Sequence, residues 1–155
     1  MSTVDGLPAH ILLNHLVVVL GPLAAILAIL CALWPAARQR LIWLTLVLTA
    51  ITLIVTPLTA NSGAWLGGKV GSSPAIETHE TLGETLAYFV AALAFAVILL
   101  TALHVRKARG HAVKSAVQAV IAVLVIGAAA ATLFQTYRVG ESGARAAWGS
   151  VASAQ

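Results

Sequence analysis

The sequence predicts an all-α membrane protein with four transmembrane helices. Hydrophobic residues make up 60% of the 155 positions and charged residues only 9%, whereas soluble domains carry about 25% charged residues. The charges also lie in short islands between four apolar runs, each near the roughly 20 residues that cross a bilayer. A third observation is that the second half of the chain repeats the first. We therefore expect a single membrane domain over residues 1–155.

The apolar runs set the boundaries of the four expected spans. They cover about 11–34, 41–60, 82–103 and 115–136. Short turns at 35–40 and 105–114 connect the spans within each pair, and a Gly-rich loop at 61–77 joins the two pairs. Residues 138–155 form a tail. Trp34 and Trp43 flank the first turn, as aromatic residues at a membrane interface do.

The basic residues predict the orientation of the spans. Six of the nine Lys and Arg residues lie in the two short turns: Arg38, Arg40, Arg106, Lys107, Arg109 and Lys114. The long loop holds only Lys69. The positive-inside rule then places both turns in the cytoplasm, and both termini and the loop 61–77 outside. Because topology explains the basic residues, no nucleic-acid partner is expected.

An internal repeat relates the two pairs of spans. One constant offset aligns His10 with His79 and His15 with Glu84. A second aligns Thr52 with Thr132 and the run Ser-Gly-Ala at 62–64 with the same run at 142–144. Two like-oriented hairpins predict parallel repeats about an axis along the membrane normal.

The polar residues of this topology gather at the outer side. His10 and Asn14 are four residues apart and share a helix face. Thr56 and Thr59, three residues apart, share a face of the second span. His15 is on another face and deeper in the span, where polar side chains are costly and usually functional. We therefore expect an outer polar cluster that includes Asn14, Thr56 and Thr59 near the two repeat-related histidines, His10 and His79.

Three interpretations of these histidines remain open. In the first, His10 and His79 are interfacial residues hydrogen-bonded to nearby carbonyls. In the second, they hold haem b or a transition metal, because neutral imidazole suits Zn, Cu and haem iron. In the third, His15 and Glu84 form a proton or ion relay. No catalytic residues are assigned, since no HExxH motif or Ser-His-Asp arrangement occurs, and the single cysteine, Cys31, offers no thiolate cluster.

Several segments resemble a family of predicted bacterial integral membrane proteins known as domain of unknown function 2231. They are the opening LPAHILLNHLVVVLGPLAAIL, the Thr56-Pro57-Leu58-Thr59 segment, His79 at the next helix start and the ending from Tyr137 to Trp148. The resemblance implies a multi-pass protein of the bacterial inner membrane with histidines at positions 10, 15 and 79. Family members are occasionally fused to Rieske or c-type cytochrome domains, which implies a role near respiratory electron transfer.

Two functional hypotheses follow. The first is a haem- or metal-binding electron-transfer protein that exchanges electrons with a membrane redox partner or respiratory complex. The alternative is a cofactor-free accessory or assembly subunit of such a complex, whose Ala- and Gly-rich helix faces bind partner helices or a second copy of the chain. A third interpretation is that the four spans form half of a dimeric transporter. It is weaker, because no polar helix face runs through the bilayer.

Overall fold

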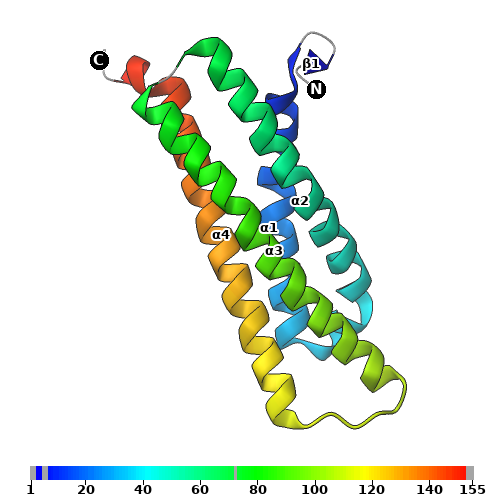
Figure 1. Ribbon diagram of the computed structural model, residues 1–155. Coiled ribbons are helices and arrows are strands. Elements are labelled where there is room, and N and C mark those ends of the chain that lie inside the picture. Colours follow the sequence, from blue (N-terminus) through cyan, green and yellow to red (C-terminus); the bar gives the residue numbers. More distant parts are fainter. Residues whose placement is uncertain (1–2, 5–6, 72, 153–155) are drawn as a thin grey trace.

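The computed structural model describes residues 3–4, 7–71 and 73–152 and confirms the all-α expectation. Its four helices are α1 (Ala9–Leu33), α2 (Pro35–Val70), α3 (Pro74–Ala108) and α4 (Ser115–Ala152), shown in Figure 1. Before α1, the two-residue strands β1 (Thr3–Val4) and β2 (Leu7–Pro8) pair in antiparallel fashion. All four helices are long and apolar enough to cross a membrane, so the chain is a multi-pass membrane protein.

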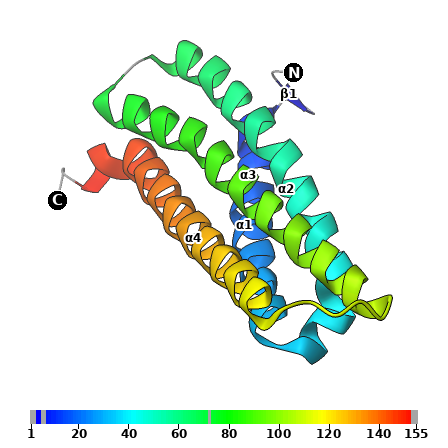
Figure 2. The same cartoon turned by 60° about the horizontal axis from the view of Figure 1, so that its bottom comes forward.

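The helices form a four-cornered bundle of two hairpins, α1–α2 and α3–α4. Each helix packs mainly on two neighbours: α1 and α3 both lie against α2 and α4, and they face each other across the diagonal. Figures 1 and 2 show the start of α1 and the end of α4 at the same end of the bundle as the end of α2 and the start of α3. We call this the histidine end. The opposite end carries the α1–α2 and α3–α4 connections, and we call it the basic end.

Small residues allow the helices to approach closely in the half of the bundle nearer the basic end. Ala24, Ala25 and Ala28 of α1 are fully buried. Ala25 and Ala28 belong to one core cluster with Val97 and Leu100 of α3. Such small side chains permit close packing in a membrane, where the hydrophobic effect does not drive helices together.

The predicted outer loop 61–77 was wrong, because most of it is helical. Helix α2 continues through this segment to Val70 and ends at Gly71, whose φ of 89° favours glycine. Helix α3 begins at Pro74, and the Ser73 hydroxyl caps it by accepting a hydrogen bond from the Ile76 N–H. Glycine and serine indicate loops in water-exposed chains, but two of these glycines, Gly63 and Gly67, instead let side chains of other helices approach α2.

The other predicted connections are also shorter than expected. Helix α2 already begins at Pro35, so the predicted turn 35–40 is helical, and α4 continues through most of the predicted tail 138–155 as far as Ala152. Of the predicted turn 105–114, only residues 109–114 are non-helical. A helix of 35 residues such as α3 is about 52 Å long, and the hydrocarbon core of a bilayer is about 30 Å thick. Helices α2, α3 and α4 therefore extend beyond the bilayer core.

Candidate functional site

The structure brings together the two histidines that the repeat relates. His10 lies in the first turn of α1, and His79 lies in the second turn of α3. Although these helices occupy opposite corners of the bundle, the two imidazole centroids are only 6.2 Å apart, with ring planes at 81°. The shared depth follows from the repeat, because equivalent positions of two parallel hairpins lie at the same level.

Backbone carbonyls fix the protonation pattern of both rings. The Nδ1 of His10 lies 3.0 Å from the Thr59 carbonyl oxygen on α2, and the Nδ1 of His79 lies 3.1 Å from the Val139 carbonyl oxygen on α4. A carbonyl oxygen can only accept, so each Nδ1 carries the proton and donates it. Among the described residues, neither Nε2 has a hydrogen-bond partner. In the neutral form of either ring, this tautomer leaves an available lone pair on Nε2.

The same supporting contacts occur in both hairpins. The Ser62 hydroxyl donates to the Thr59 carbonyl at 2.9 Å, and the Ser142 hydroxyl donates to the Val139 carbonyl at 2.9 Å. One difference is that the His79 Nδ1 also lies 3.1 Å from the Ser142 Oγ, so its N–H is shared between two acceptors. The repeat seen in the sequence is thus a repeat of contacts around each imidazole.

A glycine makes room for each imidazole. A Cβ atom placed on Gly63 of α2 would lie 2.9 Å from the His10 Cε1, and one on Gly143 of α4 would lie 3.0 Å from the His79 Cε1. Both distances are shorter than ordinary van der Waals contact, so an alanine at either position would push the ring away. The roles of these glycines were missed in the sequence, although the repeated Ser-Gly-Ala run was a signal for them.

Both histidines line a cavity of about 530 Å³ at the histidine end. Asn14, Thr56 and Thr59, the polar residues predicted to cluster there, also line it. Thr56 and Thr59 are buried, and their hydroxyls donate to carbonyls one turn earlier in α2, at 2.7 and 2.8 Å. The remaining lining is mainly small and apolar. The cavity volume lies within the range of about 300–1,000 Å³ found for cofactor and small-molecule sites.

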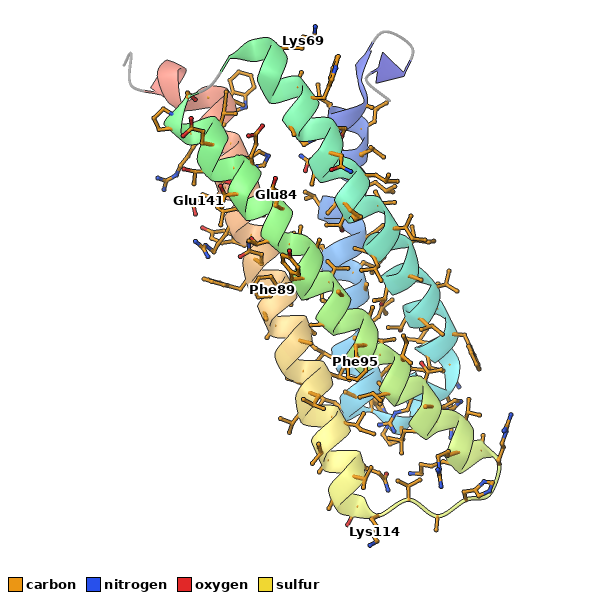
Figure 3. All side chains as sticks on the ribbon, viewed as in Figure 1. Lys69, Glu84, Phe89, Phe95, Lys114 and Glu141 are labelled. Atoms are coloured by element: carbon orange, nitrogen blue, oxygen red, sulfur yellow. The ribbon has the colours of Figure 1, made fainter. Side chains whose placement is uncertain are left out.

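The two members of the predicted relay lie in different surroundings. Glu84 lines the cavity from α3 and is labelled in Figure 3. His15 is exposed on the outer face of α1, does not line the cavity, and its Nδ1 lies 2.6 Å from the Ile11 carbonyl of its own helix. The structure shows no contact that joins these two side chains.

The ionisable side chains on the cavity wall are the two histidines and two carboxylates. Glu80 and Glu84 both belong to α3, and Glu80 packs against Gly67 of α2, where a Cβ atom would collide with its Oε1. No lysine or arginine is on this wall. Over the described ranges of the chain, no group of three or more His, Cys, Asp or Glu residues is arranged to hold a metal ion.

Comparison with family models, with curated proteins and with solved structures found no match to this chain.

Proposed function

We propose that this protein binds haem b through His10 and His79 and transfers electrons at the histidine end of the bundle. The observation that carries the proposal is the convergence of two imidazoles from opposite helices. Each is held by an Nδ1–H bond to a carbonyl and each has an unpartnered Nε2 among the described residues. Histidines that bind metals almost always donate the other ring N–H to such a partner, which orients the ring and raises its basicity.

The separation of the rings would allow both imidazoles to hold one metal atom. Bonds from imidazole nitrogen to a metal are about 2.0–2.1 Å long, and the ring centre lies about 1 Å beyond the nitrogen, so two rings that share a metal atom have centroids at most about 6 Å apart. The observed distance between the centroids is 6.2 Å.

The donor set favours haem over a bare metal ion. A structural zinc site needs four protein ligands and a catalytic one needs three, but no such group occurs in the described part of the chain. A porphyrin would itself supply four nitrogens to the iron, so that His10 and His79 would be the only ligands required from this chain. Bound haem would supply one-electron transfer, while this chain supplies the two ligands and the largely apolar cavity around them.

Location and partners form part of the same proposal. The segregation of basic residues supports an orientation with the histidine end outside the cytoplasm. The resemblance to a family of predicted bacterial inner-membrane proteins, some of which are fused to Rieske or c-type cytochrome domains, supports a respiratory redox partner. We place the protein in the bacterial inner membrane on these grounds.

An absorption spectrum of the purified protein tests the proposal. The wild-type protein should show a Soret band and stoichiometric haem, and His10→Ala and His79→Ala should each lose the band because one of the two histidines that would hold the iron is missing. His15→Ala is the matched control: it removes a histidine five residues from His10 that does not line the cavity. This variant should keep the wild-type spectrum.

A folded, colourless protein that contains no haem, expressed with haem available, would refute the proposal. The cofactor-free accessory subunit would then be the better interpretation. Loss of the band in His15→Ala together with the other two variants would show only that the bundle is sensitive to substitution near its histidine end.

A further inference from the structure

A second pocket lies at the basic end of the bundle, far from the histidines. It has a volume of about 370 Å³ and lies between the start of α2 and the end of α3. Its lining consists of Pro35, Arg38, Gln39, His104, Lys107 and Ala108. The proposed electron-transfer function uses none of these residues.

The charge around this pocket has one sign. Arg38 and Lys107 line it, and the nearby chain adds Arg40, Arg106 and Arg109. The glutamates of the described chain all belong to the histidine-end parts of α3 and α4: Glu77, Glu80, Glu84 and Glu141. The cations of the basic end therefore have no carboxylate counter-ion within the described residues, and an anion from outside the chain can neutralise them.

One neutral hydrogen-bond donor also lines the pocket. Gln39 lies in the second turn of α2, where its side-chain amide is exposed. The first turn of α2 adds no backbone donor, because Pro35 has no N–H and the Arg38 N–H donates to the Trp34 carbonyl at 2.9 Å. Ala36 and Ala37 do not line the pocket.

The two pocket cations are tied to different hairpins. Arg38 donates to the Cys31 and Ala32 carbonyls at the end of α1, at 2.7 and 3.0 Å. Lys107 donates to the Gln118 side chain of α4 at 3.0 Å. An anion bound between Arg38 and Lys107 would therefore link the α1–α2 hairpin to the α3–α4 hairpin, which makes its binding measurable as added stability.

The level of the pocket points to a lipid as the source of the anion. Trp34 and Trp43 are 62% and 56% exposed on the same end of the bundle. Exposed tryptophans of membrane proteins concentrate at the depth of the lipid headgroups. Basic pockets between transmembrane helices at this depth bind phosphate-bearing headgroups.

We infer that this pocket binds the phosphate of an anionic phospholipid headgroup, with Arg38 and Lys107 as its charged contacts and the Gln39 amide as a neutral donor. The bound lipid bridges the two hairpins at the basic end. This inference does not depend on haem binding.

Thermal unfolding in a neutral detergent tests the inference. Phosphatidylglycerol added to the full-length wild-type protein should raise Tm more than the same mole fraction of phosphatidylcholine, because a ligand that binds only the folded state stabilises it. Lys107→Gln should lose most of this difference. Lys114→Gln is the matched control, since it removes the same charge at the same end but outside the pocket, and it should retain the difference.

A second variant keeps the test decisive if Lys107→Gln is unstable. Gln39→Glu places a carboxylate in the pocket at an exposed position and should also abolish the phosphatidylglycerol effect. Equal losses in Lys107→Gln and Lys114→Gln would overturn the inference in favour of diffuse attraction to anionic lipid. Equal stabilisation by inorganic phosphate alone would overturn the lipid as the source, and no Tm difference in the wild type would overturn the site.

Discussion

At the residue scale, each imidazole is held on two sides. A carbonyl of the neighbouring helix accepts the Nδ1–H, and a glycine of that helix lies against the Cε1 edge of the ring. Nε2 takes no part in the hydrogen bond to the carbonyl, and it is farther than Cε1 from the facing glycine: a Cβ atom there would lie 3.7 Å from the His10 Nε2 and 3.5 Å from the His79 Nε2. The rings are thus oriented before any ligand arrives, and such preorganisation lowers the free-energy cost of binding.

Alanine substitution of the two glycines tests this arrangement. Gly63→Ala and Gly143→Ala should each lower haem content, because the new methyl group would displace an imidazole. Alanine is the better helix former by about 1 kcal/mol, so the helices themselves should remain folded. Haem per protein, measured by absorbance, gives the outcome.

Gly68→Ala on α2 and Gly127→Ala on α4 are the matched controls. Neither position has a neighbour within 4 Å of the added Cβ atom. Both controls should retain haem at the wild-type level. If Gly63→Ala and Gly143→Ala also bind haem normally, the rings can move freely and the contact does not position them.

At the element scale, the helices use their polar residues in two ways. A stripe of buried threonines on α2 donates to carbonyls within α2, as Thr49 does to Thr45 at 2.7 Å. Of this stripe, the Thr45 hydroxyl also lies 3.6 Å from the Cys31 Sγ of α1. Gln135 of α4 is also buried, but its amide donates to the Leu82 carbonyl and the Thr85 hydroxyl of α3, at 3.0 and 2.8 Å. The second hairpin therefore has an interhelical polar contact at a position where the first has Val55.

We expect Gln135→Leu to lower the free energy of unfolding by about 1 kcal/mol, since hydrogen bonds between helices in membranes contribute about 0.6–2 kcal/mol. Thr49→Val should change it by less, because its bond stays within one helix. Denaturation in detergent micelles measures both values. A larger effect for Thr49→Val than for Gln135→Leu would contradict this account.

The sequence predicted the elements better than their ends. The four spans were predictable because their apolar character is continuous, and the pairing of His10 with His79 was predictable because a repeat sets equal depth. Residues 61–70 were predicted as loop because glycine and serine usually favour turns. In the bundle, Gly63 is required by a side chain from another helix, and this tertiary requirement is not visible in local composition.

The supporting contacts of the site were harder to predict for a different reason. The acceptors at Thr59 and Val139 are backbone carbonyls, which every residue possesses, so no residue type marks them. Only the occurrence of the Ser-Gly-Ala run at equivalent places, 62–64 and 142–144, indicated that these two segments have the same structural role. Glu80 and the second pocket likewise depend on how α2 and α3 pack, which hydropathy does not specify.

At the scale of the whole molecule, the site belongs to neither hairpin alone. The α1–α2 hairpin holds His10 and its supports, and the α3–α4 hairpin holds His79 and its supports. A ligand that bridges both imidazoles can bind only when the hairpins are packed together. Ligand affinity and bundle stability are therefore coupled.

Depletion of haem during expression should lower the Tm of the wild-type protein. The Tm of His79→Ala should be the same whether or not haem is supplied. The reason is that haem bound only by the packed bundle adds its binding free energy to folding. Scanning fluorimetry on proteins prepared with and without a haem precursor gives the comparison. If wild-type preparations with different haem content had the same Tm, haem binding would not stabilise the bundle.

The duplicated contacts around each ring have a consequence for ancestry. Each hairpin carries a complete half-site, with an imidazole, a carbonyl acceptor and a glycine notch. Two identical copies of one hairpin, paired about a twofold axis, would therefore bring the same two imidazoles together without a second kind of hairpin. In a single chain the two halves can differ, and they do so in the Ser142 contact, in Gln135, and in Glu84 at the position equivalent to His15.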